Sequence, residues 1–98
     1  MASVWTLGTW VVKTGSEDDF VKAWADLVRR TMSAFESPQP TLLRDREHPN
    51  RFTSFGPWSD LTTIERWRDS DTFKDGVARL RPLLESFEPV TLDEVEWA

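Results

Sequence analysis

The spacing of apolar residues predicts a strand and then a long helix in the first third of the chain. Residues 3–13 are rich in β-branched and aromatic side chains, and both faces of the predicted strand are apolar. Gly8 in its middle indicates either a bulge or a close approach by other atoms. Apolar residues then recur at helical spacing over residues 16–35. Ser16 is a candidate N-cap followed by three acidic residues, and the prolines beyond residue 35 end the helix.

A β-hairpin is predicted next. Residues 41–47 and 51–56 have the composition of two strands, and the His-Pro-Asn segment at 48–50 favours a tight turn between them. Pro57 is expected to close the second strand, because proline lacks the N–H group that a sheet ladder needs.

The last third predicts a helical region in two parts and a final strand. Candidate N-caps at 59–60 and at 70–71 begin the two parts, and the apolar face of the second part continues to Leu84. Pro82 is expected to kink or end this segment. Alternating apolar and acidic residues then predict a strand over about 90–97.

The predicted order is therefore β–α–β–β–α–β, an α+β fold in a single domain of residues 1–98. Such an order gives a four-stranded antiparallel sheet with both helical regions on one face. The first strand directs Trp5 to one side of the sheet and Trp10 to the other. A second copy of the sheet is the simplest cover for the face without helices, so the pattern predicts a homodimer.

Composition excludes several kinds of site. The chain has no cysteine and one histidine, so we expect no disulfide, no thiolate or histidine-rich metal centre, and no cysteine nucleophile. The net charge of −5 disfavours nucleic-acid binding. No apolar run approaches the ~18–20 residues that span a bilayer, so we expect no membrane partner and a cytoplasmic location.

Aromatic residues suggest what the domain binds. Six Trp and six Phe in 98 residues exceed what a small core usually needs, and there is no Tyr to act as an acid or base. The surplus favours an aromatic-lined pocket or a buried interface.

Two stretches carry a resemblance to a known family. The first is VVKTGSEDDF at residues 11–20. The second comprises Leu-Arg-Asp at 43–45, His-Pro-Asn-Arg-Phe at 48–52, residues 55–59, Trp67, and Ser-Asp-x-Phe-Lys at 70–74. Together they resemble the antibiotic biosynthesis monooxygenase-type domain of the dimeric α/β-barrel superfamily. The resemblance implies a ferredoxin-like protomer, a sheet-to-sheet dimer and a pocket between sheet and helices.

The resemblance also implies chemistry without a cofactor. Family members include cofactor-free oxygenases of polycyclic aromatic or quinol substrates, haem-degrading enzymes, and proteins that isomerise or bind small molecules. The haem-degrading branch carries its iron-ligating His ten residues after the Trp that Trp67 matches, and this chain has Val77 there. Gly56 stands where the family often has an acidic residue, and Gly8 lies near the site of a strand Asn. We therefore expect no cofactor and no metal.

Four residues are candidates for substrate binding, and the sequence leaves the catalytic residue unknown. Trp67 is either core or a flat pocket wall, Trp10 and Phe73 have the same two interpretations, and Arg81 either reaches a pocket mouth or stays in solvent. Strand hydroxyls, which can orient a ligand oxygen or play no such role, are those of Thr6, Thr53 and Ser54. His48 is expected at an exposed hairpin tip, away from any pocket.

The sequence is consistent with two functions. One is a cofactor-independent monooxygenase that acts on a polycyclic aromatic or quinol-type molecule. The other is a non-catalytic module that binds a hydrophobic small molecule on the same fold. An RNA-binding sheet has the same element order, but Phe52 and Phe55 point to opposite faces and the charge is acidic.

Overall fold

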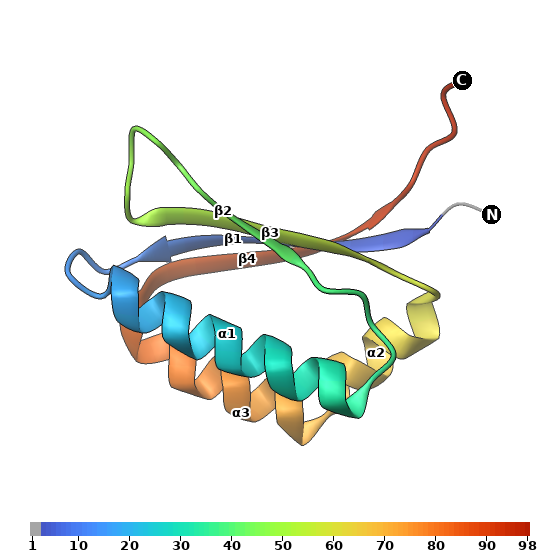
Figure 1. The fold of residues 1–98 in the computed structure, drawn as a ribbon, viewed down its shortest axis with the longest axis horizontal. Helices are drawn as coiled ribbons and strands as arrows, with labels where there is room; N and C mark the ends of the chain where they lie inside the picture. The colour runs from blue at the N-terminus through green and yellow to red at the C-terminus, as the bar shows by residue number, and fades with distance from the viewer. Residues whose placement is uncertain (1–2) are drawn as a thin grey trace.

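Four strands form one antiparallel sheet, and the helices pack on one of its faces in the computed structural model, which describes residues 3–98 (Figure 1). The elements in chain order are β1 (Val4–Val12), α1 (Glu17–Ala34), β2 (Thr41–Arg44), β3 (Arg51–Trp58), α2 (Leu61–Asp69), α3 (Asp71–Leu80), the short 3₁₀ helix η1 (Arg81–Leu83) and β4 (Leu84–Asp93). The predicted α+β, ferredoxin-like βαββαβ architecture is confirmed.

The strand order in the sheet is β2-β3-β1-β4, so β1 is central and pairs with both β3 and β4. Gly8 lies opposite Ser54 on one side and Pro89 on the other, and the register runs through it without a shift. The single irregularity of the β1–β4 ladder is between Val11 and Val12. Gly8 therefore marks a close approach by neighbouring atoms rather than a bulge.

The helix beginnings follow the predicted caps. Helix α1 begins after Ser16, whose hydroxyl makes no cap hydrogen bond, and the Glu17 carboxylate instead accepts from the Gly15 N–H. Asp60 caps α2 by accepting from the backbone N–H and the hydroxyl of Thr63. Those two hydrogen bonds lower the pKa of Asp60, because they stabilise its ionised carboxylate. Ser70 ends α2 and caps α3.

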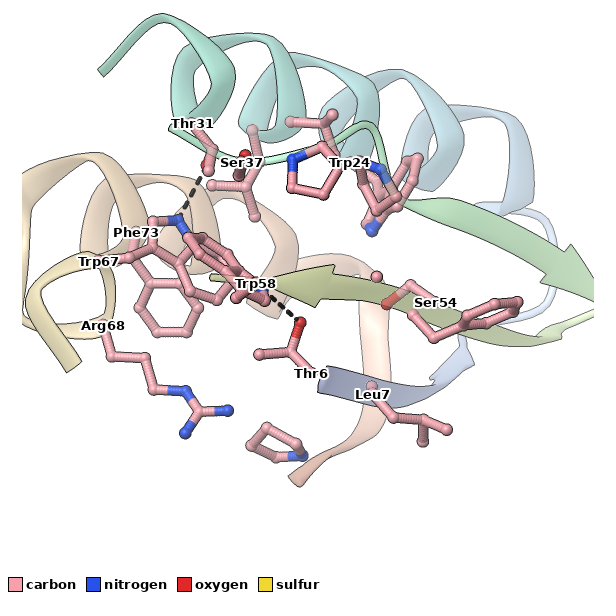
Figure 2. A pocket seen from close by; sticks show the side chains of 18 of the residues that line it. Thr6, Leu7, Trp24, Thr31, Ser37, Ser54, Trp58, Trp67, Arg68 and Phe73 are labelled. Atoms are coloured by element: carbon pink, nitrogen blue, oxygen red, sulfur yellow. Dashed lines mark hydrogen bonds between the residues drawn. The ribbon is translucent and has the colours of Figure 1, made fainter. Parts of the chain in front are cut away.

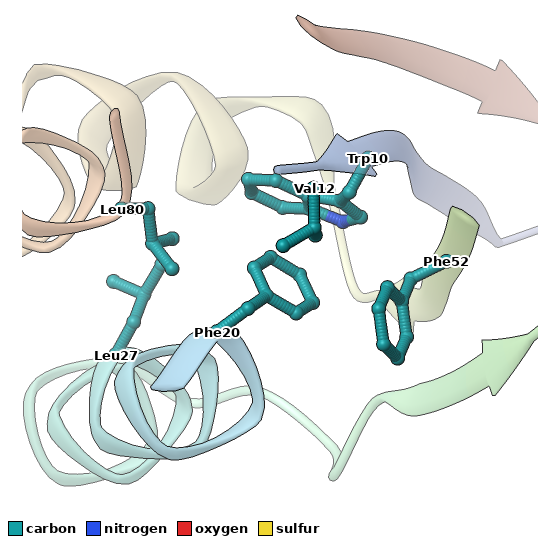
Figure 3. Close-up of a cluster of buried hydrophobic side chains, with 6 residues drawn as sticks. All are labelled: Trp10, Val12, Phe20, Leu27, Phe52 and Leu80. Carbon is teal, nitrogen blue, oxygen red and sulfur yellow. The ribbon is translucent and has the colours of Figure 1, made fainter. Parts of the chain in front are cut away.

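The core lies between the sheet and α1 and α3. Its fully or almost fully buried side chains are Trp10, Val12, Phe20, Leu27, Phe52 and Leu80 (Figure 3). Trp10 and Phe52 come from neighbouring positions of β1 and β3, and Phe20 of α1 packs on both rings. The even-numbered residues of β1 thus face the helices and Trp5 lies on the other side from Trp10, as the alternation predicted.

The hairpin boundaries differ from the sequence-based prediction. Strand β2 ends at Arg44 rather than at residue 47, because the Asp45 carboxylate accepts from the N–H groups of Glu47 and His48 and turns the chain. Both bonds lower the pKa of Asp45. Strand β3 continues past Pro57, which lies beyond the stretch that pairs with β2.

The last strand was predicted too late in the sequence. It covers Leu84–Asp93 rather than about 90–97, and Leu84 lies in the strand rather than on a helix face. Pro82 sits in η1 and ends the helical region there. Pro89 is tolerated inside β4 because β4 is an edge strand whose outer side has no partner in residues 3–98.

The sheet face opposite the helices has no cover in residues 3–98 (Figure 1). Strand register places apolar side chains from all four strands on this free face: Trp5, Leu7, Val11, Leu43, Phe55, Pro57, Val90 and Leu92. Leu43, Val90 and Leu92 are exposed. No helix within residues 3–98 is long and apolar enough to cross a membrane.

Candidate functional site

A cavity lies between the sheet and the helices, where α1, α2 and α3 pack over β1 and β3 (Figure 2). Its volume is about 80 Å³, and it opens to solvent. About 10–15 Å³ of such space holds one water, so the cavity is larger than a packing defect. Its lining is mostly apolar and aromatic, as is common for small-molecule sites.

Three aromatic rings, one each from the end of β3, from α2 and from α3, form one wall. The Trp67 ring centroid lies 5.0 Å from that of Trp58 and 4.6 Å from that of Phe73. The Phe73 ring meets Trp67 edge-on at 68°. Trp58 is almost fully buried whereas Trp67 and Phe73 are half-buried, so the exposed parts of these two rings border the cavity.

The junction between α2 and α3 fixes this wall. Ser70 donates its hydroxyl to the Trp67 carbonyl at 2.5 Å and accepts from the Phe73 N–H at 3.2 Å. One side chain therefore ends the helix that carries Trp67 and caps the helix that carries Phe73. The break between the helices holds the two rings against each other.

Each of three cavity indoles donates its N–H to a hydroxyl of a neighbouring element. Trp10 donates to Ser54, Trp58 to Thr6, and Trp67 to Thr31, at 2.9, 3.0 and 2.9 Å. These bonds satisfy the buried indole groups and hold each ring in one orientation. In each bond the hydroxyl oxygen is the acceptor, so the hydrogen of that hydroxyl can be donated to another group.

Gly8 forms part of the cavity floor, next to the hydrogen bond between Trp10 and Ser54. A Cβ atom added at this position would lie 3.0 Å from Trp10 Nε1 and 3.1 Å from Ser54 Oγ. It would also lie 3.1 Å from the ring of Phe87, which stacks on Trp10 with centroids 3.9 Å apart. The missing side chain is what allows the Trp10–Ser54 hydrogen bond to form across the strands.

Replacing Gly8 with alanine is expected to lower both stability and ligand affinity. The added methyl group displaces the Trp10 ring or the Ser54 side chain, at a cost of roughly 1–3 kcal/mol for overpacking. Thermal unfolding and calorimetric titration with a planar aromatic ligand measure the two effects. Thr9→Ala changes the next, exposed position of β1 and serves as the control. An unchanged melting temperature and affinity in Gly8→Ala contradict the expectation.

Three of the four sequence-predicted binding residues meet at this cavity. Trp67, Trp10 and Phe73 all line it, although Trp10 is almost fully buried and also belongs to the core. Arg81 lies apart from them: it borders a separate hollow near the start of β4, together with Val77 and Glu85. Of the strand hydroxyls, Thr6 and Ser54 line the cavity, and Thr53 lies on the free face of the sheet.

Arg68 contributes the charge that the sequence analysis assigned to Arg81. Among the described residues that line the cavity, it is the one with a charged side chain. Its Nη1 atom donates to the hydroxyl of Thr91 on β4 at 2.7 Å. This contact joins residues 23 positions apart, so only the adjacency of Arg68 to Trp67 signalled its place in the sequence.

The lining contains no carboxylate, imidazole or other evident proton acceptor among residues 3–98. His48 is exposed at the hairpin, with its Nδ1 atom 3.5 Å from the Asp45 carboxylate. Asp45 and Asp60, whose pKa values are lowered, also lie outside the lining. The cavity can hold a flat aromatic molecule and stabilise a negative charge, and it offers no base of its own in this part of the chain.

Sequence comparison identifies a family. The profile described as antibiotic biosynthesis monooxygenase matches residues 5–79. No curated protein matches the sequence.

Solved structures share the fold. SnoaB, a cofactor-independent oxygenase from Streptomyces nogalater, superposes with a TM-score of 0.84 at 20% identity, over 99% of this chain and 97% of its own. A conserved protein from Methanosarcina mazei Go1 gives 0.83 at 19% identity, over 94% and 92%. A protein from Shewanella oneidensis gives 0.82 at 19% identity, over 95% and 91%. At these identities the similarity establishes the fold.

Proposed function

We propose, from the premise that this chain belongs to the antibiotic biosynthesis monooxygenase family, that it is a cofactor-independent monooxygenase of a polycyclic aromatic or quinol-type molecule. The observation that supports the substrate class is the cavity wall of Trp58, Trp67 and Phe73, whose rings are held in place by hydrogen bonds of the two indoles and by tilted and edge-on ring contacts. Flat aromatic surfaces of this kind bind flat aromatic ligands.

In this reaction the substrate supplies the electrons. A phenolate transfers one electron to O₂, and the resulting radical and superoxide join through a new C–O bond at the ring carbon para to the oxygen. The peroxide takes up a proton, and its O–O bond then breaks as the ring hydrogen leaves. One oxygen atom becomes the second carbonyl of a quinone, and the other leaves as water, so four electrons pass from the phenol to O₂.

The protein contributes an apolar surface and charge stabilisation to these steps. The aromatic wall shields one face of the ring from water, and the reduced local dielectric strengthens the attraction of Arg68 for the phenolate. The phenol proton goes to solvent, because the described lining has no group that accepts it.

Oxygen labelling tests the proposal. Polycyclic phenols with a free para C–H are incubated with the protein under ¹⁸O₂, while oxygen uptake is followed with an electrode. We expect uptake above the protein-free rate, one ¹⁸O atom in the quinone and the other in water. Quinone that contains no label, or uptake no faster than without protein, contradicts a monooxygenase.

A second candidate function has one observation in its favour. The absence of an evident base from the described lining fits a module that holds a hydrophobic small molecule without converting it. Binding detected by calorimetry, together with no oxygen uptake for any ligand that binds, favours this module.

We also propose that two copies pair through the free face of the sheet. Eight apolar side chains lie there, including the exposed Val90 and Leu92, and no described element of the chain covers them. Apolar patches of this kind mark interfaces in soluble proteins. Stable association needs more than about 1,000 Å² of buried surface, and we expect the sheet-to-sheet contact to exceed this area.

A further inference from the structure

The cavity has two polar ends. Arg68 lies at one end of the labelled side chains and Ser54 at the other, with Trp58 and Thr6 between them (Figure 2). The side chain of Arg68 extends from α2, and that of Ser54 extends from β3. The surface between these two ends is largely aromatic, so a flat ligand that spans it presents one edge to each polar group.

Arg68 has donors left over for a ligand. Its guanidinium carries five N–H donors, and Thr91 accepts from Nη1. No carboxylate among residues 3–98 lies within 4.0 Å of this guanidinium, whereas Arg30 and Arg79 both pair with Asp26. The side chain is half-buried, so its charge is less screened than that of a surface arginine.

Ser54 offers a hydrogen-bond donor to a ligand. Its oxygen accepts the Trp10 indole N–H at 2.9 Å, and among residues 3–98 it has no other hydrogen-bond partner. The hydroxyl hydrogen is therefore available on the cavity side. A hydroxyl that already accepts a hydrogen bond is polarised, and it becomes a better donor.

We propose that Arg68 and Ser54 make this cavity selective for planar aromatic ligands that carry oxygen acceptors at opposite edges, one of them ionised. The ionised oxygen faces Arg68 and a carbonyl or second phenolic oxygen accepts from Ser54. Hydroxyquinones and their phenolate precursors have this pattern. The inference rests on the proposed function, because it concerns the same cavity, and it identifies the substrate as one that enters already ionised.

The cavity chemistry favours an anion over a neutral ligand of the same shape. The described lining has one full positive charge and no negative charge, although the whole chain has 17 acidic and 12 basic residues. A neutral ligand leaves the Arg68 charge partly desolvated without a partner, which is costly. An anion removes that cost and gains a charge-assisted hydrogen bond.

Binding of matched naphthoquinones tests the charge selectivity without relying on turnover. We use calorimetry at neutral pH with 2-hydroxy-1,4-naphthoquinone, which is an anion there, and 2-methoxy-1,4-naphthoquinone, which is neutral. The anion is expected to bind the wild-type protein at least ten-fold more tightly, since a charge-assisted hydrogen bond is stronger than a neutral one. Equal affinities, or no binding of either compound, overturn the inference.

Variants of two arginines on α2 locate the charge effect. Arg68→Gln is expected to remove the preference for the anion, and Arg68→Lys to retain part of it. Arg66→Gln makes the same change in net charge at an exposed position outside the lining, and should keep the full preference. If Arg66→Gln and Arg68→Gln have the same effect, the selectivity comes from overall charge and the role of Arg68 is wrong.

The role of Ser54 is tested by the ratio of the affinities for two ligands, because a change in packing alone affects both ligands equally. Ser54→Ala removes the ligand donor and also the acceptor of the Trp10 N–H, so it is compared with Ser54→Thr, which keeps the hydroxyl. We expect Ser54→Ala to lower affinity for the naphthoquinone relative to naphthalene, and Ser54→Thr to restore the ratio. Thr53→Ala, on the opposite face of β3, is the control. If both ligands lose affinity equally, Ser54 acts only by holding Trp10.

These measurements separate the inference from the proposed function. Selective binding of the anion, with no ¹⁸O incorporated into any phenol, supports the recognition chemistry and contradicts a monooxygenase. Labelled product formed from neutral and ionised substrates at equal rates supports a monooxygenase and contradicts the selectivity.

Discussion

A protein that carries Val90→Lys is expected to be a monomer of about 11.4 kDa, whereas the unmodified chain is expected to have twice that mass. Val90 lies opposite Leu7 in the β1–β4 ladder and points to the free face of the sheet, where it is 42% exposed. Within one protomer a lysine there stays in water. In a sheet-to-sheet dimer the same ammonium group is buried among apolar side chains without a partner, which costs several kcal/mol.

Sedimentation velocity or multi-angle light scattering at micromolar concentration measures this difference. Val21→Lys is the matched control, because Val21 has a similar exposure of 36% but lies on α1, away from the sheet. Far-ultraviolet circular dichroism establishes that both variants fold. The proposed dimer is wrong if the unmodified protein is already a monomer, or if Val90→Lys and Val21→Lys have the same mass.

The sequence predicts the first helix well because its signals are local. Helix α1 spans Glu17–Ala34, one residue inside each end of the predicted 16–35. The acidic first turn and the prolines that follow act on their own neighbourhood of the chain, whatever the rest of the fold does. The apolar spacing that placed Phe20 and Leu27 toward the core depends on helical geometry alone.

The last strand could not be placed from local signals. The strand predicted over about 90–97 begins directly after Pro89, a residue type that the interior of a sheet usually excludes. Pro89 lies inside β4 because β4 is at the edge of the sheet, and that position follows from the order β2-β3-β1-β4. Strand order depends on contacts between distant residues, so the sequence pattern alone does not supply it.

The candidate site likewise combines residues that local patterns reveal with one that only contacts between distant residues place there. Trp67 and Phe73 were named from helical spacing and from a family resemblance, and the structure brings them together across the break at Ser70. Arg81 was named because it lies one position from the apolar face that contains Leu80. The helix η1 begins at Arg81, however, and its side chain borders another hollow. Arg68 is directed into the cavity region by Thr91, a partner from another element that no local pattern reveals.

The largest effect on ligand binding is expected from Trp67→Leu, which removes the flat wall and keeps an apolar side chain. Trp67 is half-buried, packs against the rings of Trp58 and Phe73, and donates to Thr31, so it supports both the fold and the cavity. We expect a loss of stability of about 1–3 kcal/mol, because the leucine fills part of the space and one side of the indole already faces the cavity. Affinity for a polycyclic phenol should fall at least ten-fold with the loss of the stacking surface and of part of the apolar contact area.

Three substitutions at two positions separate a pocket wall from a core residue. Trp67→Phe keeps an aromatic face but loses the hydrogen bond to Thr31, so it should cost about 1 kcal/mol of stability and retain most of the ligand affinity. Trp97→Leu makes the same replacement as Trp67→Leu at a side chain that is 90% exposed beyond β4, and it should change neither quantity. Thermal unfolding gives stability, and calorimetry gives affinity without depending on tryptophan fluorescence. If Trp67→Leu lowers the melting temperature while binding the phenol as tightly as Trp67→Phe does, Trp67 serves the core alone and the stacking role is wrong.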